Sequence, residues 1–402
     1  MLFLGDSLEG IKCFNNKYEK LPSSKTIQFL LYINLLAYPF DAFFGSPLRK
    51  LLLVATSLVF ALLCLWYMKE KLTWGDLIFG SVLMLGLLYY RYGSQKEYKY
   101  VSLLYNAPIP ILGFCLGLVM KYMKLPRGPL LLYVVLAQLP FLYAFWFLNI
   151  DLNETGLFFT INRNTISRLL VISTAIQVMG DSVNKRKYIV MFPSILTVLC
   201  SYYSYSRAGI IVSIYLFLIV LFYNVKSFAS SYRIPNQKNS IKLFIVSVII
   251  ILLAFLFIVY IYLNSRLSTI GFKDTGRYMI YSSFFNQLTI PRLLFGFYPT
   301  IPGNLHLHNS FLSIISYFGV FSLGIFALLG ISFIHYSKRS FILANLVILW
   351  CVYSLVESIS PLDLGDLLAI PLIMLALSDR SKQKLNFANP YQFLKSLANK
   401  RQ

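Results

Sequence analysis

Long runs of apolar residues, separated by short polar segments, follow one another along nearly the whole chain. A helix needs about 20 apolar residues to cross the hydrocarbon core of a membrane, so the runs predict about twelve spans. The sixth and twelfth runs are the shortest or the most interrupted by polar residues. The predicted spans are residues 26–44, 51–68, 72–90, 101–120, 129–150, 165–181, 188–205, 208–225, 243–263, 309–335, 341–359 and 365–378.

The composition favours a membrane protein over a soluble domain. Hydrophobic residues make up 58% of the 402 residues and charged residues 13%, whereas soluble domains carry about 45–50% and about 25%. The first run is too long for the core of a signal peptide, so we interpret it as a retained span. We therefore predict an all-α integral membrane protein, with one polytopic domain over residues 1–378 and a basic cytoplasmic tail over residues 379–402.

The formal charge of +21 comes from 36 lysines and arginines against 15 acidic residues. With both termini cytoplasmic, the inside segments hold more basic residues than the outside segments by about two to one, as the positive-inside rule predicts. Most of the charge therefore anchors the topology and indicates no nucleic-acid partner. The outside group is rich in arginine after residue 160: Arg163, Arg168, Arg207, Arg266, Lys273, Arg277 and Arg292.

The preference for arginine indicates a phosphate ligand, because the planar guanidinium binds two oxygens at once and keeps its charge. Side chains that only reach out to the membrane interface could equally well be lysines. Arg207 lies between two apolar runs, in Ser206-Arg207-Ala208-Gly209, and an arginine at membrane depth indicates a site. The alternative is a snorkelling arginine at a helix end. Arg266 and Arg277 lie in the longest connection, residues 264–308, and long ordered loops are usually functional.

The residues around Arg277 favour a helix on the outer surface. Tyr278 and Tyr281 begin an aromatic run that follows Arg277 and is typical of an amphipathic helix lying at the interface. The alternative is a structural loop with exposed arginines.

Two of the three histidines, His306 and His308, lie together at the end of that connection. Asn309 or Ser310 is a candidate N-cap for the tenth span, which would put His308 beside a helix N-terminus, where anions are favoured. A neutral histidine next to a phosphate site can act as a general base. No third nitrogen or sulfur ligand is in view, so we expect no metal. The alternative is a histidine packed at the interface.

Several enzyme classes lack their signatures in this sequence. It holds no G-x-x-x-x-G-K-[ST], no G-x-S-x-G and no Asp-x-Asp in an outer loop. The five cysteines form no C-x-x-C pair, which argues against a disulfide framework or a zinc site. Asp41, Asp76 and Glu357 fall in or near spans, where a charge is costly and tends to be functional. A proton-coupled transporter could use such acids, so that function stays an alternative.

The order and spacing of the motifs resemble the bacterial O-antigen polymerase and ligase superfamily. The similarity covers residues 160–330, whereas the first 150 residues match only as hydrophobic spans. The motifs that carry it are Ser206-Arg207-Ala208-Gly209, Gly276-Arg277, Leu294-Phe295-Gly296, His308-Asn309-Ser310-Phe311-Leu312 and Gly319.

The resemblance implies a fold like the many-helix GT-C membrane glycosyltransferases, without a metal or other cofactor. Such an enzyme acts at the outer face of the bacterial inner membrane and transfers a glycan from undecaprenyl diphosphate to an acceptor hydroxyl. By the same resemblance, Arg207, Arg266 and Arg277 would hold the leaving diphosphate. His308 would take the acceptor proton, and Asn309 would help to orient the acceptor. Further candidates are Arg163, Arg168, Tyr278 and Tyr281 for carrier or sugar contacts, and Asp274 or Glu357 as an acidic partner.

Several functions stay open at this point. We favour a polymerase that joins O-antigen or capsule repeat units in lipopolysaccharide biosynthesis. A ligase would use the same donor and lipid A–core as acceptor. A flippase for lipid-linked sugars would have paired discontinuous spans in two halves, and a scaffold would need no chemistry. The expected partners are the undecaprenyl diphosphate-linked glycan, the acceptor glycan or lipid A–core, membrane lipids and a chain-length regulator.

Overall fold

The regular structure in the described part of the chain is entirely helical. The computed structural model describes residues 25–44, 47–93, 107–147, 163–231, 237–265, 268, 277–301, 307–361 and 363–384. The helices are α2 (Lys25–Phe44), α3 (Pro47–Met68), α4 (Trp74–Gly93), α6 (Pro108–Tyr122), α7 (Arg127–Phe147), α8 (Arg163–Val183), α9 (Phe192–Tyr203), α10 (Arg207–Ser231), α11 (Gln237–Leu263), α13 (Arg277–Asn286), α14 (Ile290–Phe295), α15 (Ser310–Phe318), α16 (Ser322–Ser337), α17 (Phe341–Val356) and α18 (Asp366–Lys384).

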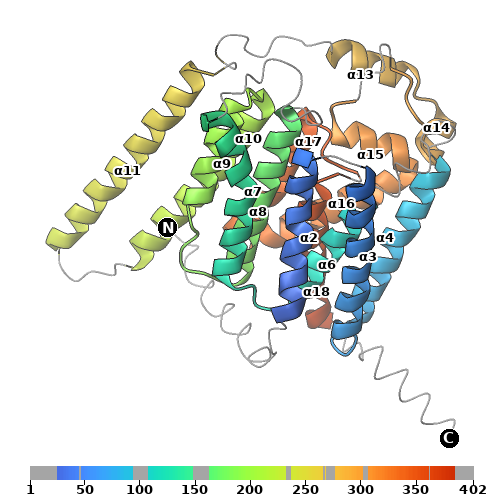
Figure 1. The fold of residues 1–402 in the computed structure, drawn as a ribbon, viewed down its shortest axis with the longest axis horizontal. Coiled ribbons are helices and arrows are strands. Elements are labelled where there is room, and N and C mark those ends of the chain that lie inside the picture. Colours follow the sequence, from blue (N-terminus) through green and yellow to red (C-terminus); the bar gives the residue numbers. More distant parts are fainter. Residues whose placement is uncertain are drawn as a thin grey trace, which may run out of the picture.

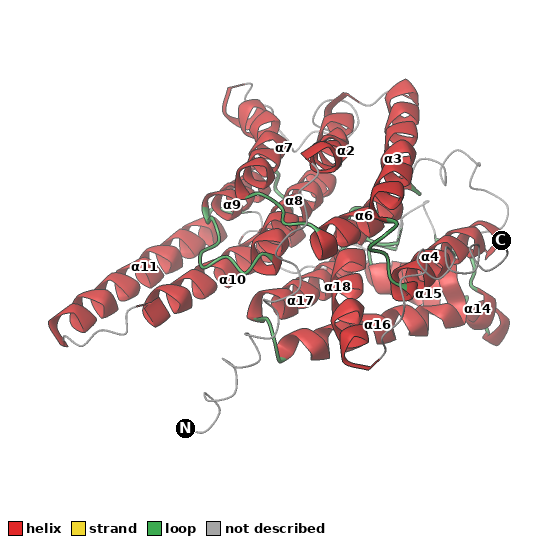
Figure 2. Cartoon of the chain, turned by 90° about the horizontal axis from the view of Figure 1, so that it is seen from below, coloured by secondary structure: helices red, strands yellow, loops and turns green. Residues whose placement is uncertain are grey.

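The long helices run side by side as a bundle, and α11 leans away from it in both views (Figures 1 and 2). Stretches long and apolar enough to cross a membrane, found among the described residues, are Arg127–Phe147, Asn164–Val183, Arg207–Phe228 and Ser310–Ser337. These four support an all-α membrane protein. The larger number of about twelve spans stays a prediction, because within the described residues only these four stretches meet the length and apolarity of a span.

Helix α8 lies in the interior of the bundle and carries polar side chains along its buried length. In a bilayer such groups must bond to neighbouring helices, because lipid offers no partner. Ser167 lies 2.7 Å from the Ser204 hydroxyl after α9, and Thr174 lies 2.7 Å from Thr197 of α9. These bonds fix the rotation of α8, and with it the direction of the polar residues at its two ends.

The turns that join α3 to α4, α6 to α7, α8 to α9 and α16 to α17 lie together at the lower end of the bundle in Figure 1. At the first two of these connections, Lys121 in the last turn of α6 forms an ion pair of 2.7 Å with Asp76 in the first turn of α4. Asn184 donates a hydrogen bond of 3.1 Å to the carbonyl of Leu125, and the hydroxyls of Ser182 and Ser340 are 3.2 Å apart. We call this the lower end, and the opposite end, where α8 and α10 begin, the upper end.

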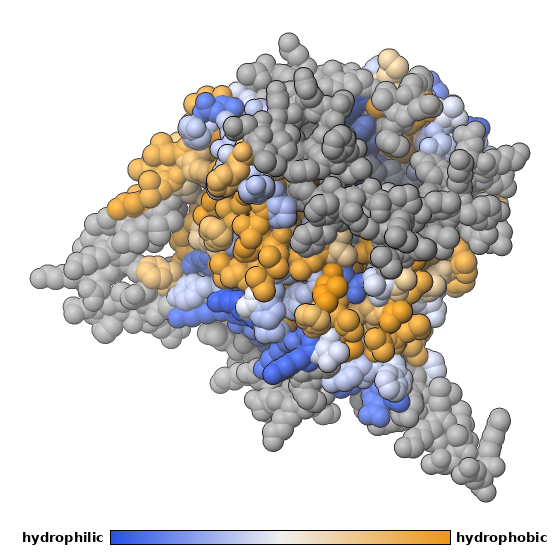
Figure 3. Space-filling view, in the orientation of Figure 1, coloured by the Kyte–Doolittle hydropathy of each residue, from blue (hydrophilic) through white to orange (hydrophobic). Residues whose placement is uncertain are grey.

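The lower end gathers the cations that the sequence assigned to inside loops. Figure 3 shows hydrophilic side chains there, below a belt of hydrophobic ones. The cytoplasmic side of this end stays a prediction. The residues are Lys69, Lys71, Lys121, Lys124, Arg127, Lys185, Arg186, Lys187, Lys338 and Arg339.

Two of the predicted spans differ from the helices observed in a way that bears on the candidate site. The run 309–335 is divided at Gly319, whose φ of 52° ends α15 before a 3₁₀ turn leads into α16. The run 341–359 is helical only to Val356, so Glu357 lies beyond the end of α17. Apolarity alone overestimated the second helix, because the segment after Val356 bonds to α15 instead of continuing the helix.

Candidate functional site

The N-terminus of α15 is fastened to the end of α17 at the upper end of the bundle. Asn309 is the N-cap that the sequence suggested: its side-chain oxygen accepts a bond of 3.1 Å from the Leu312 N–H. The hydroxyl of Ser310 donates to the carbonyl of Glu357 at 3.1 Å and accepts from the Ile359 N–H at 2.7 Å. The residues just before α15 are therefore held against the segment that follows α17.

His308 directly precedes this cap and has left-handed backbone geometry, with φ of 48°. This geometry costs a residue with a Cβ about 1–2 kcal/mol, so the surrounding contacts must fix it. It brings the His308 Nδ1 atom to 3.6 Å from the carboxylate of Glu357. The imidazole is about one-third exposed, so the ring is held by a buried acid and remains accessible.

Glu357 is 5% exposed and lies among three side chains from distant parts of the chain. Asn164, in the first turn of α8, donates a bond of 3.0 Å to the carboxylate. Arg277, the first residue of α13, approaches the same oxygen at 3.6 Å, and His308 approaches the other oxygen. We name these four residues the Glu357 cluster. Arg277 and His308 both stand 3.6 Å from the carboxylate, and the side chain of each is 34% exposed.

A second ion pair supports the segment that carries Glu357. Arg168, one turn after Asn164 on α8, donates a bond of 2.6 Å to Asp363. Its guanidinium also bonds to the Ser358 carbonyl and to the Thr165 hydroxyl. The Arg168 guanidinium thus joins α8 to two points of the segment between α17 and α18, at Ser358 and at Asp363. These bonds fix the position of Glu357 relative to α8.

Helix α10 begins against α8 at the same end. The Ser206 hydroxyl accepts a bond of 3.1 Å from the Gly209 N–H, so Ser206 caps the helix that Arg207 opens. Gly209 faces Ser167 so closely that a Cβ on the glycine would lie 2.4 Å from the Cβ of the serine. The small residues of this motif therefore allow α10 to approach α8, and Arg207 stands half-buried one residue after the cap.

The motifs at Gly296 and Gly319 meet in space. A Cβ on Gly319 would lie 2.4 Å from the Leu294 carbonyl, and one on Gly296 would lie 2.7 Å from the Ser316 carbonyl. Both glycines have positive φ, of 79° at Gly296 and 52° at Gly319. The contact packs α14 against the end of α15.

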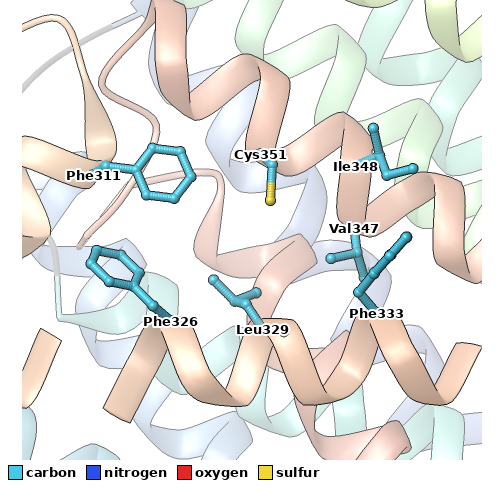
Figure 4. Close-up of a pocket in the computed structure, with 8 residues that line it drawn as sticks. Phe311, Phe326, Leu329, Phe333, Val347, Ile348 and Cys351 are labelled. Carbon is cyan, nitrogen blue, oxygen red and sulfur yellow. The ribbon is translucent and has the colours of Figure 1, made fainter. Parts of the chain in front are cut away.

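An apolar cavity of about 330 Å³ lies between α16 and α17 and begins beside the site. Phe311, two residues after the Asn309 cap, stands at its edge and meets the rings of Phe326 and Trp350. Figure 4 shows the side chains of Leu329 and Cys351 directed toward the same gap. Phe311 thus connects the capped start of α15 to an apolar cavity between two helices.

The structure brings three of the predicted site residues together: His308, Arg277 and Asn309. Arg207 lies at the same end of the bundle, on the helix packed against α8. Tyr281 packs against a small apolar cluster beneath α13, whereas Tyr278 is 77% exposed and points away from it. The side chain of Arg163, and the whole of Arg266, Asp274 and His306, lie outside the described residues.

Two acids that the sequence singled out have different roles. Asp76 bonds to Lys121 at 2.7 Å and to the Tyr122 hydroxyl at 2.5 Å, and it caps its own helix, so it is a structural anchor of the lower end. Glu357 is instead the acidic partner of His308. Sequence reasoning missed Asn164 as its hydrogen-bond donor. No local signal exists for this contact, which joins residues 193 positions apart.

Among the described residues, no three His, Cys, Asp or Glu side chains gather into a set that could hold a metal ion. The sequence matches no protein-family model, and no curated protein is similar to it.

Proposed function

We propose that this chain is a metal-independent membrane glycosyltransferase of the O-antigen polymerase type. It takes a glycan from undecaprenyl diphosphate and joins it to a sugar hydroxyl of another lipid-linked repeat unit, at the periplasmic face of a bacterial inner membrane. The observation that carries the proposal is the Glu357 cluster, in which a buried carboxylate holds an accessible histidine beside an arginine.

The histidine and the carboxylate suit proton transfer from an acceptor hydroxyl. Glu357 faces Nδ1 of His308, which leaves Nε2 of the ring to receive the proton. The nearby carboxylate stabilises the imidazolium that forms and holds the ring in one orientation, as the acid of a catalytic triad does. Because the Glu357 side chain is buried, this electrostatic effect is stronger than it would be in water.

The arginines suit the other half of the reaction. Breaking the bond between sugar and diphosphate leaves negative charge on the phosphate oxygens, and guanidinium groups aimed at that charge stabilise the transition state. Arg277 is partly exposed beside His308, and Arg207 lies at the same end. The apolar cavity between α16 and α17 offers a place to one part of the carrier's hydrocarbon chain, near the end where its diphosphate would lie.

The decisive experiment is transfer by the purified full chain in nanodiscs, with a synthetic undecaprenyl diphosphate repeat unit as donor and acceptor. We expect polymer from the wild type, and none above background from His308→Ala. Arg207→Lys keeps the charge but loses the fork, so we expect it to lower the rate strongly. The exposed Lys338→Glu at the lower end is the control. Full polymer from His308→Ala would remove the general base from the proposal.

Lipopolysaccharide from a deletion strain separates the polymerase from its rivals. Loss of a polymerase leaves core bearing one repeat unit. Loss of a ligase leaves bare core, with polymer held on the carrier, and loss of a flippase traps single repeats on the cytoplasmic side. Complementation with His308→Ala should reproduce the deletion pattern while the protein remains in the membrane.

A further inference from the structure

A second cavity, at the lower end of the bundle, is lined by cations. It has a volume of about 410 Å³ and is formed by Arg127, Arg186, Lys187 and Tyr188. Arg127 opens α7, and the other three residues belong to the turn between α8 and α9. The cavity lies at the end of the molecule opposite the Glu357 cluster, so it plays no part in the proposed transfer reaction.

The cations in this cavity outnumber the acid that faces them. Asp181 is fully buried beneath it and receives a bond of 2.6 Å from Arg186. Arg127 approaches the same carboxylate only to 3.8 Å; its Nε atom is buried without a hydrogen-bond partner among the described residues. Lys187 lies above the Tyr188 ring at 5.3 Å. One carboxylate therefore faces two arginines, and Lys187 adds a third positive charge to the lining of the cavity.

The walls of the cavity are fixed in place rather than free to collapse onto the acid. Side chains of α10 hold the backbone of the turn: Tyr223 donates a bond of 2.8 Å to the Arg186 carbonyl, and Ser227 donates one of 2.6 Å to the Lys187 carbonyl. Asn224 exchanges two bonds with Ile189, at 2.9 and 2.8 Å. A preformed basic cavity loses little entropy when it takes up an anion.

The depth of the cavity indicates which anion it meets. It lies where α7 and α8, both long and apolar enough to span a membrane, reach their ends. Next to it, Tyr188 is 38% exposed and Phe192, the first residue of α9, is 54% exposed. Aromatic side chains at the ends of spans lie at the level of lipid headgroups. Arg127 also begins a helix, whose N-terminal dipole favours negative charge.

We propose that this cavity binds the phosphate of an anionic phospholipid headgroup, such as that of phosphatidylglycerol, with the acyl chains lying along α9 beside Phe192. Basic pockets between membrane helices bind anionic headgroups in this way, and the attraction per lysine or arginine is sufficient for preference over zwitterionic lipid. The site selects lipid by charge, independently of the chemistry at the upper end.

The test titrates short-chain phosphatidylglycerol into the full chain in a zwitterionic detergent and follows the unfolding temperature. We expect phosphatidylglycerol to raise it by roughly 2 °C or more at saturation. Phosphatidylcholine and inorganic phosphate should leave it unchanged. Lys187→Glu should weaken the apparent affinity for phosphatidylglycerol about tenfold or more. Lys71→Glu is the matched control, because Lys71 also lies above a tyrosine ring, at 5.5 Å, but outside the cavity.

Three results would overturn the proposal. An equal shift with inorganic phosphate would make the site a free-anion site. An undiminished affinity in Lys187→Glu would place the lipid elsewhere. An equal loss in Lys187→Glu and Lys71→Glu would reduce the effect to general surface charge. Arg127→Gln provides a second variant if Lys187→Glu fails to fold, because the Arg127 side chain is 41% exposed and removing its charge leaves Arg186 paired with Asp181.

Discussion

The two ends of α8 each hold a buried carboxylate with cationic partners, but the two clusters are built differently. At the lower end, Asp181 is fully buried and receives bonds of 2.6 Å from Arg186 and 2.7 Å from Gln177. At the upper end, Glu357 receives one bond of 3.0 Å from Asn164, and Arg277 and His308 stand at 3.6 Å. The lower carboxylate is therefore saturated on both oxygens, whereas the upper one is not.

The difference indicates what each cluster is for. A buried charge that is fully bonded to its partners contributes to one fixed structure, and removing it leaves an uncompensated cation. A buried carboxylate that faces partly exposed ionisable side chains is typical of a functional site. We therefore expect the Asp181 end of α8 to serve structure, and we propose the Glu357 end as the site of the chemistry.

The largest expected effect is on turnover at the upper end. His308→Ala removes the proposed general base and should lower the rate of glycan transfer about a hundredfold to ten-thousandfold. Glu357→Gln should lower it on the order of a hundredfold, because the imidazolium loses its stabilising charge. Transfer in nanodiscs with quantified folded protein measures both. If Glu357→Gln kept the wild-type rate while Asp181→Asn lost it, the assignment of the two ends would be reversed.

The next effect is on stability at the lower end. Asp181→Asn leaves Arg186 and Arg127 without their carboxylate, so we expect the free energy of unfolding to fall by about 3 kcal/mol. Glu357→Gln should cost clearly less, because the side chains of Arg277 and His308 are partly exposed and can turn to water. Denaturation in mixed micelles compares the two. Equal losses would show that both carboxylates are structural.

The sequence predicted where the helices lie better than how far they extend. Apolar runs placed α17 correctly but carried it past Val356, because Ile359 continues the apolar pattern. The helix ends where it does because Ser310 of α15 bonds to the Glu357 carbonyl and to the N–H of Ile359. Such a stop depends on a helix that lies close by in space, which periodicity along the chain does not encode.

Residue chemistry predicted the Asn309 cap from its local signature, and the structure confirms that cap. It also singled out His308 and Arg277, whose roles in a site stay predictions. It left the acidic partner open between Asp274 and Glu357, and it missed Asn164, because these contacts are long-range. The same limit applied to Asp76, whose charge in a span indicated function until its contact with Lys121 showed a structural role.

An intermediate effect is expected from the ion pair that fixes the segment after α17. Arg168→Lys keeps a positive charge near Asp363 but cannot also bond to the Ser358 carbonyl and the Thr165 hydroxyl. We expect transfer to fall about tenfold, with donor KM little changed, because Glu357 loses its position rather than its charge. Steady-state kinetics over a donor series measures both constants. A change in KM alone would mean that Arg168 contacts the donor directly.

The smallest expected effect comes from removing a helix cap at each end of the bundle. The two caps are a matched pair, so this comparison tests the difference between the ends most directly. Asn309 caps α15 at the upper end with a bond of 3.1 Å to the Leu312 N–H. Ser340 caps α17 at the lower end with one of 3.3 Å to the Leu343 N–H. Either residue changed to alanine should lose about 1 kcal/mol of stability.

Activity should distinguish the two caps. Asn309→Ala frees the backbone at His308, whose left-handed geometry depends on the capped turn that follows, so transfer should fall severalfold more than stability explains. Ser340→Ala should leave transfer by the folded protein unchanged. The comparison needs only the transfer rate and the unfolding midpoint of both variants. Equal activity in the two would mean that a structure-wide loosening, and not the geometry of the Glu357 cluster, limits the reaction.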